Sequence, residues 1–399
     1  MPKIYIADSY ALNTGDLGIL FSLIASIKRR FPLAKIIVES SHPRHLRNYK
    51  EMNELLIVPR IFDIEKIDKR EGELLSKIVA TFIGIFDSST FLIYALLKSA
   101  HIDFPFMVRR KRRAQALILS DVQCVLSTGG GFLSTRYNYG FRLLTYSVAL
   151  LLKRKLYLCA QSIGPFETRL SRALIPFFLS KCDLITVREP WSSEYLNQFN
   201  TDAVLTADLA FLLPSHKSIK AQQQSVSICI KDDGSLYSKK NLIDLVQYLL
   251  EKNYYVYVIS HTPVDDTLGQ RIVNKVESKF VRLVKFGEDP SYVKQIYASN
   301  DFIISSRMHG IIFASERGIP FIALSYEPKF SGLFQLLRYD NQFIFETGTP
   351  SLNELIRIVE VLIKNRLKIQ AHLIEVLPDI KESAQRNILK LEELIYASI

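Results

Sequence analysis

The chain has 399 residues, 48% hydrophobic and 23% charged, which excludes extensive disorder and leaves enough apolar side chains for two folded domains. The net charge of +11 favours anionic partners, such as phosphorylated substrates, an acidic membrane surface or nucleic acid. Four cysteines form no C-x-x-C pair, which is typical of thiols in a reducing compartment. The N-terminus lacks the pattern of a signal peptide, so we expect a cytoplasmic protein.

Short apolar runs alternate with helical patterns through residues 1–214, which predicts an N-terminal α/β domain with helices on both faces of a parallel sheet. The runs expected as strands are Lys3–Ala7, Ala34–Glu39, Leu55–Val58, Val122–Ser127, Leu156–Ala160, Asp183–Val187 and Ala203–Leu205. The helical patterns are Asp16–Arg30, Tyr137–Lys153, Arg169–Ser180 and Pro190–Phe199.

The region 74–113 departs from this alternation. Its apolar stretch Ile78–Leu97 nearly reaches the length of a membrane span, but Asp87 and the cluster Ser88-Ser89-Thr90 interrupt it. We therefore expect two helices, either buried or lying at a membrane interface. Five consecutive cations, Arg109–Arg113, follow. They suit a peripheral contact with anionic lipid, although the solvated face of an ordinary helix is the commoner meaning of such a run.

Residues 215–224 are polar and have no apolar period, which predicts a linker. Residues 225–350 then repeat the alternation as a C-terminal α/β domain. Its expected strands are Ser225–Ile230, Tyr255–Ser260, Val281–Phe286, Phe302–Ser305 and Pro320–Ser325, and its helices are Asn241–Lys252, Gly269–Phe280, Pro290–Ser299, Gly310–Arg317 and Phe330–Leu337. The tail 351–399 has helical patterns divided by Pro378, and we expect it to pack back on the N-terminal domain. Two doubly wound parallel-sheet domains facing a cleft are predicted, with ligands at the carboxyl ends of the strands.

Several loops of the first half end a predicted strand. Asn13-Thr14-Gly15-Asp16 opens a helix, where Asn13 or Asp16 can serve as the cap and the first amides can hold an anion; a plain cap without a ligand is the simpler interpretation. Gly129, Gly130 and Gly131 form either a nest of amides for an oxygen-rich ligand or a tight turn into a helix. Gln161 stands in the same position after the next strand.

The second half contains the most informative loop, Ser305–Gly310, between an apolar strand and an apolar helix. Arg307 offers a planar fork for a carboxylate or phosphate, and His309 lies at the helix start. Such a pair can bind an anion and move a proton. Lys329 follows the next strand and adds a cation to the same region. His261, after an earlier strand, is either an acid–base group or a helix cap.

The ordered landmarks of the chain resemble the polysaccharide pyruvyl transferase family along nearly its whole length. They are N-x-G-D at 13–16, the glycines at 129–131, Gln161–Pro165, Arg188-Glu189 with Ser192, Thr206-Ala207-Asp208, His261 with Asp266, Arg307-Met308-His309, and Tyr326–Lys329. The resemblance implies a fold like that of GT-B glycosyltransferases, with the N-terminal domain on the acceptor side and the C-terminal domain on the donor side.

The same resemblance implies phosphoenolpyruvate as the donor and a sugar of a cell-surface polysaccharide, or of its lipid-linked precursor, as the acceptor. The product is a pyruvyl ketal, and neither a metal nor a cofactor is implied. Arg307 and His309 match the donor-site pair of the family, and Lys329 matches its lysine. One departure is clear: Cys229 stands about where similar proteins carry an arginine, and Lys231 lies two residues further on.

From these residues we assign Arg307 and Lys329 to the donor anions, His309 to proton transfer or to the phosphate, and Asp16 to activation of a hydroxyl. The further residues assigned to substrate binding are Asn13, Gly129, Gly130, Gly131, Gln161, Lys231, His261 and Ser306. Two alternatives stay open, a GT-B glycosyltransferase that uses a nucleotide sugar and a non-catalytic member of a glycan assembly complex. A nucleic-acid partner is not expected, because no binding motif accompanies the positive charge.

Overall fold

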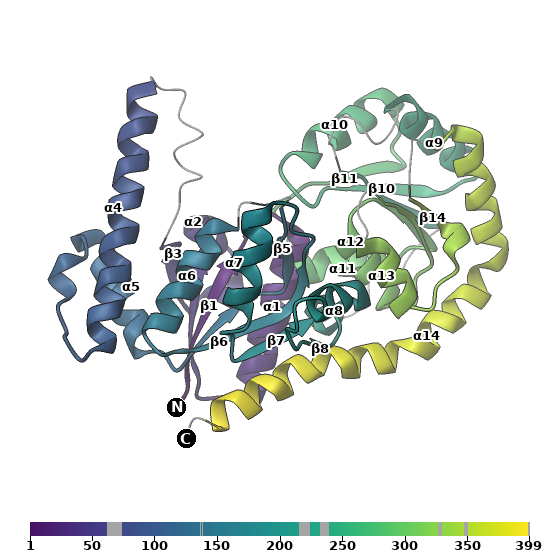
Figure 1. Cartoon of the computed structure of the whole chain (residues 1–399). Helices are drawn as coiled ribbons and strands as arrows, with labels where there is room; N and C mark the ends of the chain where they lie inside the picture. Colours follow the sequence, from purple (N-terminus) through teal and green to yellow (C-terminus); the bar gives the residue numbers. More distant parts are fainter. Residues whose placement is uncertain are drawn as a thin grey trace. The chain divides into compact units, whose positions relative to one another are not determined.

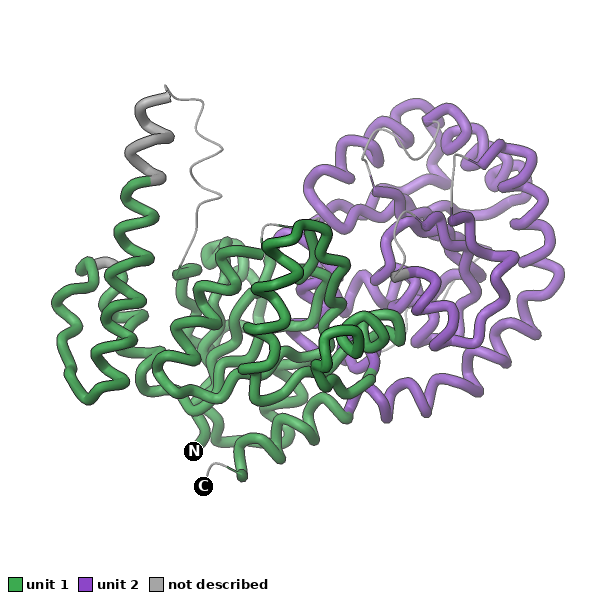
Figure 2. Tube along the Cα trace, viewed as in Figure 1, with its two compact units in different colours: residues 1–11, 23–206, 386–399 green, residues 12–22, 207–385 purple. Residues whose placement is uncertain are grey.

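The computed structural model describes residues 1–61, 74–135, 137, 139–214, 224–231, 239–325, 329–346 and 350–397, and only the backbone of 74–81, 111 and 329. The chain divides into two compact units, coloured in Figure 2. Unit 1 comprises Met1–Ala11, Leu23–Thr206 and Arg386–Ile399, and unit 2 comprises Leu12–Ser22 and Ala207–Gln385. All but the last residue of the expected linker 215–224 lies outside the described residues.

Unit 1 is built on an eight-stranded sheet in the order β3-β2-β1-β4-β6-β7-β8, with β5 paired to β6, and every recorded pairing is parallel (Figure 1). The strands are β1 (Lys3–Ser9), β2 (Lys35–Ser40), β3 (Leu56–Pro59), β4 (Cys124–Ser127), β5 (Gly130–Leu133), β6 (Lys155–Ile163), β7 (Leu184–Val187) and β8 (Val204–Leu205). Its helices are α2 (Pro43–Leu46), η1 (Lys50–Met52), α4 (Leu74–Ser99), η2 (Pro105–Met107), α5 (Arg110–Asp121), α6 (Gly140–Leu151), α7 (Arg169–Leu179) and α8 (Pro190–Asn197).

Unit 2 contains a six-stranded parallel sheet in the order β11-β10-β9-β12-β13-β14. The strands are β9 (Ser225–Cys229), β10 (Tyr255–Ile259), β11 (Val281–Val284), β12 (Phe302–Ser305), β13 (Phe321–Leu324) and β14 (Ile344–Phe345). Its helices are η3 (Leu209–Leu212), α9 (Lys239–Glu251), α10 (Asp265–Val276), α11 (Pro290–Ala298), α12 (Met308–Ser315), α13 (Lys329–Leu336) and η4 (Asn341–Phe343). Two helices, α1 (Thr14–Arg30) and α14 (Leu352–Tyr396), contribute to both units.

The strands are apolar because both faces of each sheet are covered. β4, β9, β12 and β13 are buried at every position, as expected for parallel strands between two layers of helices. Each expected strand is present within a few residues, and the predicted pair of doubly wound parallel-sheet domains is confirmed. The carboxyl end of β12 therefore delivers the loop that contains Arg307 and His309 to one edge of the sheet in unit 2.

Residues 386–396 of α14 belong to unit 1, where Asn387 is fully buried. Its side-chain oxygen accepts hydrogen bonds from the hydroxyls of Thr186 (2.6 Å) and Thr206 (3.0 Å), and its carbonyl accepts one from Tyr157 (3.0 Å). The two oxygens of Asn387 thus accept hydrogen bonds from buried hydroxyls of β6, of β7 and of the segment that follows β8.

The expectation of two helices in 74–113 around an interruption at Asp87 is wrong, because α4 runs unbroken from Leu74 to Ser99. The hydroxyls of Ser88 and Thr90 donate to the carbonyls of Gly84 (2.8 Å) and Asp87 (3.1 Å), so they bond to the turn behind them and leave the helix intact. Among the described residues, α4 is the one helix whose length and composition would allow it to cross a membrane, and the core helix of a soluble protein passes the same test.

Two further local expectations are corrected. Pro378 does not divide the C-terminal helix, because α14 continues through it. The proline lies on the exposed side, where the carbonyl that loses its amide partner can bond to water. Gly130 and Gly131 form no turn into a helix; they begin β5, which extends the sheet beside the end of β6.

Candidate functional site

The turn between β12 and α12 is held by its own serines. The Ser305 hydroxyl accepts the amide of Arg307 (3.0 Å) and donates to the Arg307 carbonyl (2.8 Å). The Ser306 amide donates to the carbonyl of Cys229 (2.9 Å), and its hydroxyl accepts the amide of Lys231 (2.7 Å). Arg307 is therefore fixed as the residue that precedes the first turn of α12, with extended φ and ψ of −101° and 116°.

A buried carboxylate orients Arg307. Its Nη2 forms an ion pair with Oδ1 of Asp265 and a hydrogen bond with the Thr262 hydroxyl (3.1 Å). The other Asp265 oxygen accepts the backbone amides of His261 (3.2 Å) and Thr262 (3.0 Å). Asp265 thus fixes the loop after β10 and the guanidinium together, which limits the directions in which the guanidinium can point.

A second carboxylate lies beside His309 in the first turn of α12. Nε2 of His309 is 3.5 Å from Oδ2 of Asp208, while Oδ1 of Asp208 accepts the amide of Ala210 (2.8 Å). Both side chains are largely buried, with 12% and 5% exposed. The N-terminus of α12 disfavours a cation at this position, whereas Asp208 can stabilise the imidazolium that forms when the ring takes up a proton.

The start of α1 packs directly against this imidazole. Asn13 accepts the Gly15 amide through its side-chain oxygen (2.8 Å) and caps the helix, as the sequence predicts. A Cβ atom at Gly15 would collide with the ring of His309, so the glycine is required for this close approach. The Thr14 amide donates to the carbonyl of His261 (2.8 Å). Asp16 lies half-buried in the same first turn of α1.

The imidazole of His261 is 1% exposed and bonds to the hydroxyl of Tyr297 (2.9 Å between Nε2 and the oxygen). Burial lowers the pKa of His261 well below its usual value, and the charges of Arg307 and His309 lower it further. His261 is therefore neutral near pH 7 and lies in the packed layer behind the turn. Burial also raises the pKa of the Cys229 thiol to about 12, so the position where the family resemblance leads us to expect an arginine carries no charge.

Unit 1 brings other predicted residues together. Gln161 is buried, and its amide nitrogen donates to the Ser127 hydroxyl (3.0 Å). That hydroxyl donates in turn to Asp8 (2.7 Å), which has φ of 66° and also accepts the hydroxyl of Tyr146. A Cβ at Gly130 would collide with the Phe132 ring of the same strand. Gly130 and Gly131 therefore lie at the start of β5, and Gln161 lies near the end of β6, where buried hydrogen bonds link neighbouring strands of unit 1.

The structure brings Asn13, Asp16, His261, Ser306, Arg307 and His309 together in unit 2, with the Lys231 backbone at the same turn. The side chain of Lys329, like residues 326–328, lies outside the described part of the chain. Asp208 and Asp265 are the residues whose role the sequence did not indicate. Asp208 belongs to a landmark named above, and Asp265 directly precedes the landmark residue Asp266. An aspartate near a helix start is most often a cap, and only the fold shows what else it contacts.

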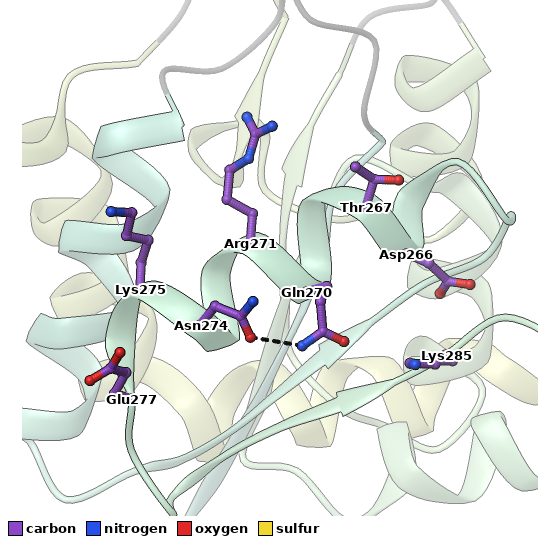
Figure 3. A pocket seen from close by; sticks show the side chains of 8 residues that line it. All are labelled: Asp266, Thr267, Gln270, Arg271, Asn274, Lys275, Glu277 and Lys285. Atoms are coloured by element: carbon purple, nitrogen blue, oxygen red, sulfur yellow. Dashed lines mark hydrogen bonds between the residues drawn. The ribbon is translucent and has the colours of Figure 1, made fainter.

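A surface concavity of about 900 Å³ lies elsewhere in unit 2, along α10. Its lining residues are Asp266, Thr267, Gln270, Arg271, Asn274, Lys275, Glu277 and Lys285 (Figure 3). Figure 3 shows Arg271 and Glu277 pointing to different sides of the helix rather than converging on one point. The concavity includes neither Arg307 nor His309. Within the described residues, no cluster of His, Cys, Asp or Glu side chains has the geometry to hold a metal ion.

Comparison with known sequences supplies the family. Residues 13–328 match the sequence profile of Polysaccharide pyruvyl transferase, well over half of the chain. The chain belongs to the polysaccharide pyruvyl transferase family. A curated relative, the amylovoran biosynthesis protein AmsJ of Erwinia amylovora, is 24% identical in an alignment 255 residues long. The alignment covers 55% of this chain. The match spans 60% of the length of that relative.

Solved structures of similar shape support the fold of this family member. The Staphylococcus aureus MnaA–UDP structure aligns with a TM-score of 0.62 at 11% identity, over 100% of this chain and 98% of its own. UDP-GlcNAc 2-epimerase from Neisseria meningitidis bound to UDP-GlcNAc gives 0.60 at 11%, over 98% and 100%. A glycosyltransferase from Rickettsia africae gives 0.58 at 10%, over 99% and 98%. At such identities the likeness establishes the GT-B-type fold alone.

The contact between Gly15 and His309 predicts an unusual sign for a glycine-to-alanine change. Gly→Ala in a helix ordinarily stabilises by about 1 kcal/mol. Gly15→Ala is expected instead to destabilise this pyruvyl transferase family member by roughly 1–3 kcal/mol, because the new methyl group collides with the imidazole. Chemical denaturation measures the change, and the ¹⁵N shifts of His309 report the displaced ring. Gly131→Ala is the control, since its Cβ meets nothing closer than 3.7 Å. A stabilised Gly15→Ala variant contradicts the contact.

Glu39 of β2 is 1% exposed, and its pKa is raised to about 7 by burial and by the charge of Asp8, against the opposing charge of Arg60. The folded chain thus binds a proton that the unfolded chain releases above about pH 4.3. Its stabilising effect is complete below that pH and is lost as the pH rises through 7. Glu39→Gln retains an acceptor for the Ile61 amide (2.8 Å) and stays neutral.

The variant Glu39→Gln should therefore gain stability relative to the wild type as the pH rises from about 4.5, by roughly 3–4 kcal/mol once the pH exceeds about 7. Denaturation across this pH range measures the gap between the two proteins. Glu54→Gln is the control, since the Glu54 side chain is 86% exposed. Parallel stability curves for Glu39→Gln and the wild type would show that the carboxyl titrates normally.

Proposed function

We propose that the protein transfers a pyruvyl group from phosphoenolpyruvate to two hydroxyls of a sugar, in a polysaccharide or its lipid-linked precursor, and forms a ketal. The observation that carries the proposal is the pair Arg307 and His309 at the N-terminus of α12, each beside a buried carboxylate. The match to the family supports the transferase class and the polysaccharide setting. The donor and the ketal are the proposed part.

The donor has two anionic groups, a carboxylate and a phosphate. The guanidinium of Arg307 matches either group through its planar fork, and Asp265 holds the fork in place. The backbone amides that open α12 and its dipole add partial positive charge at the same point. Lys231, whose amide bonds to Ser306, and Lys329, which opens α13, are the further cations we assign to the donor.

The reaction needs one proton donor and one acceptor. The methylene carbon of the donor takes a proton, the adjacent carbon becomes oxocarbenium-like, and two hydroxyl oxygens add to it as phosphate leaves. Of the two hydroxyl protons, one replaces the proton given to carbon and the other leaves with the phosphate. His309 is the group we assign to proton transfer, since Asp208 can stabilise its charged form. Asp16, beside Gly15 in α1, is assigned to hydroxyl activation.

Cys229 places a neutral thiol next to the proposed donor turn. It lies at the end of β9, and its carbonyl bonds to the Ser306 amide (2.9 Å), so it adjoins the proposed donor turn. A cation there would add to the attraction for the donor, whereas a thiol with a pKa of about 12 adds none. We propose no direct donor contact for Cys229 and assign the charge at this edge to Lys231.

The acceptor side is proposed for unit 1, through Gly129–Gly131 and Gln161, in a protein that works at the cytoplasmic face of a membrane. The four cysteines are free thiols, which suits a reducing compartment. A glycosyltransferase using a nucleotide sugar is the second candidate, and the glycosyltransferase of Rickettsia africae among the structural neighbours favours it. A non-catalytic role in a glycan assembly complex is the third. Thermal shifts with phosphoenolpyruvate and with nucleotide sugars separate the first two.

Variants of the turn test the proposed chemistry. Arg307→Ala and His309→Ala should each lower kcat/KM for phosphate release from phosphoenolpyruvate, in the presence of lipid-linked glycan, by about 10²-fold or more. Arg307→Lys keeps the charge without the fork and should fall between wild type and Arg307→Ala. Arg317→Ala, at an exposed arginine after α12, is the matched control.

Folding must be checked alongside turnover, because removal of Arg307 leaves Asp265 buried without its ion-pair partner. Circular dichroism and denaturation of each variant serve this purpose. Near-normal phosphate release by both alanine variants would contradict the assignment of the turn. If the protein turned over a nucleotide sugar and not phosphoenolpyruvate, the proposed donor would be wrong and the proposed site would stand.

A further inference from the structure

The part of α4 that follows residue 81 begins with an apolar surface that no other described element covers. Phe82, Ile85 and Phe86 are 68%, 55% and 58% exposed, and no side chain between residues 82 and 89 is buried. A run of exposed apolar side chains of this kind is uncommon on a protein surface in water. We call residues 82–89 the exposed segment of α4.

The C-terminal part of α4, residues 90–99, is anchored in unit 1. Phe91, Tyr94 and Ala95 are buried in the hydrophobic core of the unit, and α4 packs against α5 and α6. A membrane span needs about 20 apolar residues, so a span over Phe82–Ser99 would have to withdraw these side chains from the core.

A set of cations lies beside the exposed segment. Nη1 of Arg109 forms an ion pair with Asp87 of α4 (3.1 Å), which places the residue before α5 against the middle of α4. The chain continues into the basic run Arg109–Arg113, in which Arg110 is exposed. Arg113 lies over the ring of Phe106 (4.6 Å), and that ring is itself 68% exposed.

The loop between α4 and α5 adds more apolar surface next to these cations. Ile102 and Phe104 are 52% and 53% exposed. Over residues 82–113 the sequence has six cations and two carboxylates; the cations are Lys98, Arg109, Arg110, Lys111, Arg112 and Arg113, and the carboxylates are Asp87 and Asp103. The surface thus combines aromatic and aliphatic side chains with a net positive charge.

We infer that the exposed segment of α4, the loop 102–106 and the basic run 109–113 dock together on an anionic lipid bilayer. The apolar side chains enter the headgroup boundary, and Arg109 and Arg110, the exposed arginines of the run, contact lipid phosphates. Charge complementarity selects this occupant. A second copy of the chain, paired through this surface by a two-fold axis, would bring the same excess of cations over carboxylates against itself.

The inference does not depend on the donor, and it deepens the membrane location given under the proposed function, on which it rests. It would hold for any enzyme of this chain that acts on a membrane-bound substrate, and it would fail without affecting phosphate release from phosphoenolpyruvate with a soluble acceptor. If both proposals hold, the docked surface keeps unit 1 at the membrane that carries the lipid-linked glycan.

Co-sedimentation of the full chain with vesicles tests the surface. Vesicles of equal parts phosphatidylglycerol and phosphatidylcholine should bind the wild type, and vesicles of phosphatidylcholine alone should bind it at least tenfold more weakly. Phe82→Ser with Phe86→Ser should weaken binding to the anionic vesicles by tenfold or more. Arg110→Gln should weaken it roughly fivefold and reduce its salt dependence.

Two matched variants control for unspecific effects. Leu367→Ser removes an apolar side chain that is 72% exposed on α14, and Arg29→Gln removes an exposed cation on α1; both should bind like the wild type. Equal binding by the α4 variants and the wild type would overturn the inference, as would equal binding to both kinds of vesicle. A dimer in sedimentation velocity that Phe82→Ser with Phe86→Ser dissolves, without vesicle binding, would assign the surface to a second copy instead.

Discussion

Two buried carboxylates determine what the turn after β12 can do. Arg307 and His309 are separated by one residue in the sequence and would otherwise be free to change rotamer at a helix start. Asp265 ties the guanidinium to the loop after β10, and Asp208 lies beside the imidazole from the segment after β8. The parallel sheet makes this possible, because the carboxyl ends of its strands lie at one edge and their loops meet there. Close packing of Gly15 against the imidazole completes the arrangement.

The same packing buries most of the turn and places a carboxylate beside each of its two basic side chains. Partial burial raises the strength of each charge interaction, and Arg307 is matched by Asp265 so that neither charge is left unpaired. His261 and Cys229, in the layer behind, are held neutral by burial. The positive character of the site thus depends on the few cations at the turn and on the amides of α12. Loss of the arginine expected from the family at Cys229 makes Lys231 and Lys329 correspondingly more important to the proposed donor site.

Hydrophobic patterning was sufficient to predict most of the fold. Fully buried parallel strands appear as short apolar runs, and each expected run is a strand. The glycine strand β5 escaped prediction because its side chains carry no pattern, and β14 because it has two residues. Two residue patterns that usually end a helix led to wrong predictions. In α4 the serine and threonine hydroxyls bond to carbonyls of the preceding turn, and at Pro378 the unpaired carbonyl can bond to water, so both helices continue. Arg307 and His309 were apparent from their chemistry, but the contacts of Asp208 and Asp265 depend on residues distant in the sequence.

The central claim is transfer of a pyruvyl group to a glycan, and the product itself tests it most directly. The purified chain would be incubated with phosphoenolpyruvate and lipid-linked glycans extracted from cells, and the glycans analysed by mass spectrometry. The account predicts a mass increment of one pyruvyl ketal on the glycan, formed with release of one phosphate, and its loss when Arg307 is replaced by alanine. An unchanged glycan, or one that gains a sugar when a nucleotide sugar is supplied instead, would contradict it.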